Sequence, residues 1–157
     1  MRRIALLAPF ALALAACTGS APPVAATMSA QAAPQQAEAR IGDVVVHASA
    51  VQTSTLDAAI AKRYGLERSG RTAMLLVGVR RADGSDASGL PVNIEATVSP
   101  NGGTPQRVTL REIRVDGLVD RIGTVEIAPP ETLRFDVVVR YGDSTSTMRF
   151  TRDFFPR

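Results

Sequence analysis

Cys17 is the only cysteine of this 157-residue chain, and its thiol is the strongest nucleophile that the sequence offers. It closes the run Leu14-Ala15-Ala16-Cys17, which follows the charged start Met1-Arg2-Arg3 and the mostly apolar residues 4–16. A charged start, a short apolar segment and a small-residue cleavage zone are the three parts of an export signal. The apolar segment is too short to cross a hydrocarbon core of about 30 Å as a helix, and Pro9 interrupts it. The sequence therefore predicts an exported protein.

The run ending in Cys17 resembles the lipobox of bacterial lipoproteins, in which a peptidase cuts before a cysteine whose sulfur carries diacylglycerol. The resemblance implies a signal peptide over residues 1–16 and a mature chain that begins at lipidated Cys17. Ordinary secretion is the alternative, because Ala13-Leu14-Ala15 also fits an A-x-A cleavage pattern. An unpaired thiol is a liability in an oxidising compartment, which favours lipidation. Thr18 replaces the aspartate that favours inner-membrane retention, so we expect outer-membrane anchoring facing the periplasm.

His47 is the sole histidine, so any histidine-centred catalytic group depends on it. It lies in the strand-like run Val44-Val45-Val46-His47, where a hydrogen-bonded structural histidine is favoured over a catalytic base. One histidine and a lipidated cysteine cannot supply the usual ligands of structural zinc. We predict no metal, no cofactor and no enzymatic activity, with Cys17 as the lipid attachment site. A site made of carboxylates alone stays open in principle.

Several polar groups have both a chemical and a structural interpretation. Asp83-Gly84-Ser85-Asp86 gathers oxygen atoms but lacks the closing glutamate of a calcium loop, so it is predicted as a turn. Asn101-Gly102-Gly103 has no following lysine or helix and is predicted as a loop rather than a phosphate site. Glu112 with Glu126 or Asp136 would form an acid/base couple across strands, although exposed strand charges explain them.

The arginines of the second half of the chain also allow two interpretations. If strand register gathered them on one sheet face, they would form a weak anion surface. Alternation of charged outward residues with apolar inward ones is the simpler interpretation. The five residues are Arg111, Arg114, Arg121, Arg134 and Arg140.

The overall charge argues against nucleic acid as a partner. The formal charge is +3, and removal of Arg2 and Arg3 with the signal leaves about +1. Basic residues are mixed with acidic ones, and there is no basic run with interleaved aromatics. We predict no nucleic-acid binding.

Residues 17–40 are predicted to form the lipidated cysteine and a flexible tether. The segment is rich in Ala, Pro and Gln and contains Pro22, Pro23 and Pro34, which disfavour an alternative helix. A flexible coil of this length reaches roughly 25 Å. The domain would then lie near the membrane without being embedded in it.

Residues 41–157 are predicted to form one all-β domain. Strand candidates lie at residues 43–51, 72–81, 92–98, 108–115, 118–127, 133–141 and toward the end, where Met148, Phe150 and Phe154 share a face. Asp116-Gly117 predicts a hairpin turn. Ser54 or Thr55 is expected to cap one short helix that ends at Gly65. The expected architecture is an immunoglobulin-like antiparallel β-sandwich of about seven strands with one short helix.

Three segments carry a resemblance to a known family. They are Ala61-Lys62-Arg63-Tyr64-Gly65-Leu66-Glu67-Arg68-Ser69 with Leu75-Leu76-Val77, Leu110-Arg111-Glu112-Ile113-Arg114, and Glu131-Thr132-Leu133-Arg134-Phe135-Asp136. Together they resemble the bacterial envelope family catalogued as domain of unknown function 4426, over nearly all of residues 41–157. The resemblance implies a small exported β-sandwich and transfers no catalytic residues. The lipobox and long tether depart from relatives that look simply secreted.

The leading functional hypothesis is a non-enzymatic, lipid-anchored envelope protein. Its partners would be the membrane, through lipid on Cys17, and an unidentified periplasmic or outer-membrane component that the sandwich binds or supports by strand addition or loop contacts. A carboxylate-dependent envelope hydrolase and a periplasmic folding helper are the alternatives. Converging carboxylates in a pocket would favour the hydrolase, and an exposed sheet edge would favour the binding protein.

Overall fold

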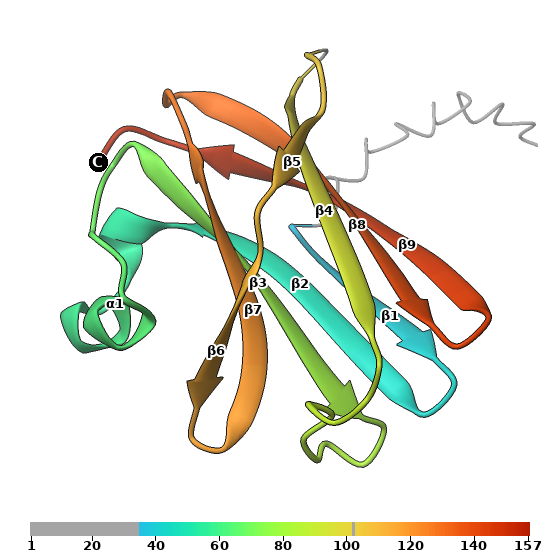
Figure 1. Cartoon of the computed structure of the whole chain (residues 1–157). Helices are drawn as coiled ribbons and strands as arrows, with labels where there is room; N and C mark the ends of the chain where they lie inside the picture. Colours follow the sequence, from blue (N-terminus) through green and yellow to red (C-terminus); the bar gives the residue numbers. More distant parts are fainter. Residues whose placement is uncertain (1–34, 102) are drawn as a thin grey trace, which may run out of the picture. The chain divides into compact units, whose positions relative to one another are not determined.

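The computed structural model describes residues 35–101 and 103–157 (Figure 1). The predicted signal peptide, Cys17 and the tether up to residue 34 lie outside the described residues. The elements in chain order are β1 (Gln36–Ile41), β2 (Val44–Gln52), the short 3-10 turn η1 (Thr53–Thr55), α1 (Ala58–Tyr64), β3 (Thr72–Arg81), β4 (Asn93–Pro100), β5 (Gln106–Val108), β6 (Arg111–Val115), β7 (Leu118–Glu126), β8 (Glu131–Tyr141) and β9 (Ser144–Phe154).

The strands form two antiparallel sheets. The five-stranded sheet has the order β1-β2-β3-β7-β6, and the four-stranded sheet has the order β5-β4-β8-β9. Figure 1 shows β8 and β9 as a long hairpin in orange to red, separate from the green and cyan strands β2 and β3. The predicted all-β antiparallel sandwich is confirmed, and β3 is the central strand that its apolar sequence predicts.

Alternating side chains of both sheets form the main core. On β8 the inward stripe Leu133, Phe135, Val137 and Val139 is at most 3% exposed. The rings of Phe135 and Phe150 stack across the β8–β9 pair with centroids 5.1 Å apart. Because side chains in a strand alternate between faces, the period-2 pattern of the sequence identifies this core.

Two differences raise the strand number from about seven to nine among the described residues. Residues 36–40, assigned to the tether by their composition, form β1 together with Ile41 and pair with β2. Ala37 and Ala39 pack against the core, so tertiary contacts outweigh the weak strand preference of this segment. The expected strand 108–115 is instead divided into β5 and β6, which belong to different sheets.

The predicted helix is present, but its first residue and cap differ from the expectation. Asp57 caps α1, since its Oδ1 accepts a 2.7 Å hydrogen bond from the N–H of Ala59. Ser54 and Thr55 lie in η1 instead. Gly65 ends the helix in the left-handed conformation, with φ of 62°, as the sequence predicts.

A second apolar cluster lies on the outer face of the five-stranded sheet. Its buried members are Met74, Ile113 and Ile122, and Leu56, Tyr64 and Leu66 from the helical segment pack against them. Arg111 of β6 donates a hydrogen bond to the Tyr64 carbonyl and so joins α1 to the sheet edge. The helix therefore covers one part of this face.

Candidate functional site

His47 lies on β2 opposite Glu38 of β1. Its Nδ1 is 3.2 Å from Glu38 Oε2, and the two side chains are 57% and 61% exposed. The register places Gly78 of β3 on the other side of His47. The predicted strand position of His47 is confirmed. Its polar partner is a carboxylate that composition had assigned to the tether.

The carboxylates considered as an acid/base couple are not brought together. Glu112 of β6 forms an ion pair with Arg121, at 3.1 Å between Oε1 and Nη2. Glu126 lies five residues beyond Arg121 on β7, which places it about 17 Å from Arg121 at the usual rise per residue. Asp136 belongs to the other sheet, where it accepts from Arg134 and Arg149. These groups support the interpretation as surface ion pairs.

The five arginines considered as an anion surface are divided between the two sheets. Arg111, Arg114 and Arg121 lie on β6 and β7, whereas Arg134 and Arg140 lie on β8. Arg140 pairs with Glu95 at 3.4 Å. The register therefore does not assemble a single basic face from these residues.

The Asp83–Asp86 region is a turn with its carboxylates bonded to neighbouring serines. Asp83 Oδ1 accepts from the N–H of Ser85 at 2.9 Å and from its hydroxyl at 2.7 Å. Asp86 accepts from the hydroxyl and the N–H of Ser88. These hydroxyl bonds are the largest cause of a lowered pKa at both carboxyl groups. The predicted turn is confirmed.

A partly buried ion pair, which sequence reasoning missed, lies where β3 separates from β7. The last residue pair of these strands is Gly78 with Asp120. Arg80 Nη2 is 2.6 Å from Asp120 Oδ1, and the two side chains are only 20% and 12% exposed. A Cβ at residue 78 would lie 3.3 Å from Asp120 Oδ1, so glycine leaves room for this pair.

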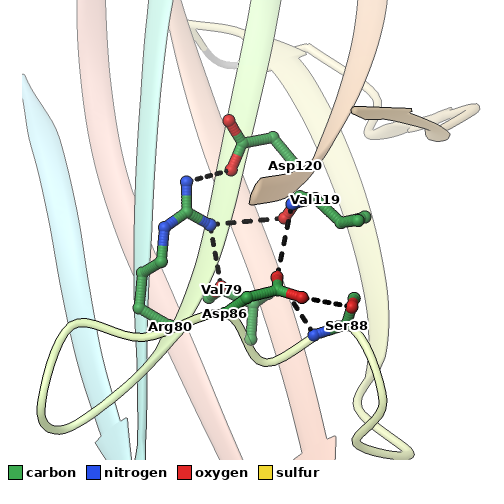
Figure 2. Close-up of polar contacts among 6 residues, drawn as sticks. All are labelled: Val79, Arg80, Asp86, Ser88, Val119 and Asp120. Atoms are coloured by element: carbon green, nitrogen blue, oxygen red, sulfur yellow. Dashed lines mark hydrogen bonds and ion pairs between the residues drawn. The ribbon is translucent and has the colours of Figure 1, made fainter. Parts of the chain in front are cut away.

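Val119 of β7 lies beyond the last β3–β7 residue pair, and side chains form the hydrogen bonds to its backbone that a strand would otherwise form (Figure 2). Arg80 Nη1 donates to the Val119 carbonyl at 3.3 Å, and Asp86 Oδ1 accepts from the Val119 N–H at 3.4 Å. Both backbone groups of Val119 are therefore satisfied beyond the end of the β3–β7 ladder. The same contacts fix loop 82–92 to the sheet.

Loop 82–92 lies beside β6. Ser88 and Leu90 of the loop line one small hollow with Glu112 and Arg121. The positive charge of Arg114 on β6 also contributes to the lowered pKa of Asp86. The ion pair and the turn therefore position the loop next to the edge of the five-stranded sheet.

The outer edge of β6 is the candidate binding site. Strand β6 pairs with β7 on one side and has no strand partner on its other side within residues 35–101 and 103–157. Unpaired backbone N–H and C=O groups of an edge strand can bind an extended chain. We call residues 111–115 the β6 edge. Its exposed side chains are Arg111, Glu112 and Arg114.

Asp120→Asn is expected to lower the free energy of unfolding by about 1–3 kcal/mol, because it leaves the Arg80 charge without its partner in a poorly solvated place. Hydrogen exchange should also become faster in loop 82–92. Asp116→Asn is the matched control: Asp116 is 83% exposed in its pair with Arg63, so a loss below about 0.5 kcal/mol is expected. Equal losses in chemical denaturation would contradict a stabilising role for the Arg80–Asp120 pair.

The fold defines an antiparallel β-sandwich domain in which β6 is one of the edge strands. Residues 38–157 match the family model described as Domain of unknown function (DUF4426), and the chain belongs to this family. The resemblance inferred from sequence is thereby confirmed, with nearly the expected boundaries.

Solved structures share the fold. A DUF4426 family protein from Pseudomonas aeruginosa PAO1 is 22% identical with a TM-score of 0.62, covering 78% of this chain and 97% of that one. A copper-bound variant of FetP from uropathogenic Escherichia coli strain F11 is 11% identical with a TM-score of 0.51, covering 76% and 95%. FetP from the same strain, expressed in the periplasm, is 10% identical with a TM-score of 0.51, covering 76% and 93%. No curated protein matches the chain.

No helix among the described residues is both long and apolar enough to span a membrane. No group of three or more histidine, cysteine, aspartate or glutamate side chains in this part of the chain is arranged to hold a metal ion.

Proposed function

We propose that the protein is a non-enzymatic lipoprotein, anchored in the outer membrane by lipid on Cys17, whose sandwich binds another envelope component from the periplasmic side. The observation that carries the binding proposal is the open β6 edge beside the fixed loop 82–92. Strand addition there would use backbone hydrogen bonds for affinity, and side-chain contacts would give specificity.

The charges of the β6 edge support a selective partner. Arg111, Glu112 and Arg114 are exposed, and charged edge strands resist pairing with unrelated strands. Glu112 already pairs with Arg121, whereas Arg114 forms no ion pair among the described residues. A partner strand with an acidic side chain opposite Arg114 would overcome this barrier, and an apolar strand would leave the Arg114 charge without compensation. We therefore propose an extended segment of an envelope protein as the ligand of the β6 edge.

A photo-crosslinking amino acid at Arg114 is expected to capture one reproducible partner in living cells. The matched control is the same amino acid at Thr147, a position on β9 of the other sheet. Mass spectrometry of the adducts identifies the partner and the crosslinked segment. The absence of an adduct at position 114, or equal capture of the same protein at position 147, would contradict binding at the β6 edge.

Cys17→Ser is expected to release the protein into the soluble periplasmic fraction or to block its processing, because serine cannot carry the thioether-linked lipid. Two or three acyl chains hold a protein firmly at a membrane, whereas removal of all of them leaves no such anchor. Fractionation of outer and inner membranes, with mass measurement of the mature chain, tests this. Unchanged processing and unchanged membrane fractionation would exclude lipid anchoring through Cys17.

A further inference from the structure

The end of the sandwich where β9 finishes exposes an aromatic side chain. Phe155 is 61% exposed, whereas the nearby Phe154 is 2% exposed and belongs to the core. Phe155 lines a hollow of about 180 Å³ together with Arg152 and Arg157. An aromatic ring and arginine side chains that line the same hollow combine apolar surface with positive charge in one place.

Two further arginines come from the loop that precedes β3. The loop lies against the last residues of the chain, since a Cβ at Gly70 would be 3.5 Å from the Arg157 carbonyl. Gln52 Nε2 donates to the Gly70 carbonyl at 2.6 Å and holds the loop in place. Arg68 and Arg71 of this loop are exposed.

We call Phe155, Arg68, Arg71, Arg152 and Arg157 the basic aromatic end. No carboxylate of the described residues lies within 4.0 Å of any of these four guanidinium groups. The same end also carries acidic groups, since Asp153 lines this hollow and Glu126 and Glu131 line another hollow with Arg71. Because none of the four arginines forms an ion pair among the described residues, each guanidinium group can bind an anionic group.

The chain enters the domain at the same end. Arg152 donates a hydrogen bond to Gln35, the first described residue, and both line the hollow beside Phe155. The segment that connects Cys17 to the domain is covalently joined at Gln35. A tether from lipidated Cys17 would therefore join the sandwich at this end.

The opposite end carries acidic turns. The strand register places the connections β1–β2, β3–β4, β6–β7 and β8–β9 away from the end of β9 (Figure 1). Their aspartates are Asp43, Asp83, Asp86, Asp116 and Asp143, of which Asp43 pairs with Arg81 and Asp116 with Arg63. A membrane with negative surface potential attracts arginine side chains that form no ion pair, which favours contact through the four arginines of the basic aromatic end.

We infer that the basic aromatic end rests on the anionic phospholipid headgroups of the membrane that holds the lipid of Cys17. This inference depends on the proposed lipid anchoring. Phe155 would enter the interface between headgroups and acyl chains, and the arginines would contact lipid phosphates.

Phe155→Trp tests the orientation, because the chain contains no tryptophan and the substitution introduces its only indole fluorophore. The lipidated full-length mature chain is reconstituted in phosphatidylcholine vesicles with or without phosphatidylglycerol, and with brominated acyl chains for quenching. In the anionic vesicles we expect blue-shifted emission and quenching by the brominated lipid. Tyr141→Trp, beside the β8–β9 turn at the other end, is the control and should not be quenched.

Arginine variants in the Phe155→Trp background test the electrostatic part. Arg71→Gln and Arg157→Gln should each lower the ratio of docked to undocked protein by about fivefold, and added salt should weaken docking. Arg140→Gln, near the β8–β9 turn at the other end, should leave the ratio unchanged. Quenching that does not depend on phosphatidylglycerol or on these arginines would overturn the recognition of anionic lipid.

The outcomes separate this inference from the proposed anchoring. If the chain does not associate with vesicles at all, lipid anchoring fails and the orientation fails with it. If the Phe155→Trp protein associates but its emission is neither shifted nor quenched, anchoring stands and the docked orientation is wrong. If the Tyr141→Trp protein is quenched instead, the domain lies on the membrane through the acidic turns, which also overturns the inference.

Discussion

Phe135→Ala is expected to lower the free energy of unfolding by about 3–5 kcal/mol. Phe135 is fully buried on β8, and its ring stacks on Phe150 with an interplanar angle of 13°. Alanine would remove this contact and leave a cavity between the sheets that neighbouring side chains cannot fill without shifting. A loss of this size is a large part of the stability of an ordinary domain. Urea unfolding followed by circular dichroism measures it.

Phe155→Ala provides the matched control for this prediction. It removes the same ring from a position that is 61% exposed, so a change below about 0.5 kcal/mol is expected. Similar losses in the two variants would show that ring removal, and not burial in the β8–β9 core, determines the effect.

Gly123→Ala is expected to lower the free energy of unfolding by about 3 kcal/mol, a large effect for one methyl group. A Cβ at this position would lie 2.5 Å from Val108 Cγ1 and 2.7 Å from the Thr109 carbonyl oxygen. The chain crosses here from β5 in one sheet to β6 in the other. Because one of the clashing atoms is the backbone oxygen of Thr109, the segment between β5 and β6 would have to move to accommodate the methyl group.

Gly89→Ala is the control for the crossover prediction. A Cβ at residue 89 would meet no atom within 4 Å. Its effect should therefore lie between no change and a stabilisation of about 1 kcal/mol, because alanine reduces the entropy of the unfolded chain. Thermal unfolding of both variants provides the comparison. A stable Gly123→Ala protein would mean that the crossover is not closely packed on β7.

Strong local patterns explain why much of the fold could be predicted. The stripe from Leu133 to Val139 alternates cleanly, and the turn Asp116-Gly117 adopts φ values of 51° and 82° that suit a two-residue hairpin. Gly65 supplies the left-handed residue that ends α1. In each of these cases the residue types favour the observed backbone without help from distant contacts.

Strand β1 could not be predicted because its stability comes from other segments. Its sequence QAEARI contains few strand-favouring residues, and its pairing with β2 and the packing of two small alanines hold it in the sheet. Similarly, nothing near Val108 indicates that the chain changes sheets there. The space left by Gly123, which is distant in sequence, permits it.

The candidate site depends on contacts between residues far apart in the chain. Arg80 and Asp120 lie on strands whose apolar pattern was recognised, but their meeting depends on the β3–β7 register ending at Gly78. The available signals were Arg80 at the end of one apolar run and Asp120 within another. The lipid site stays a prediction because Cys17 lies outside the described residues. The partner of the β6 edge is likewise a prediction.

The position of β1 has a mechanical consequence. If the protein is anchored through Cys17 and bound to a partner as proposed, tension between the two would enter the domain at Gln35, directly before β1. The six residue pairs between β1 and β2 would bear this force first. Detachment of β1 would withdraw Ile41 from the core and uncover the neighbouring β9. The strand that the sequence reveals least is thus the one expected to yield first under pulling.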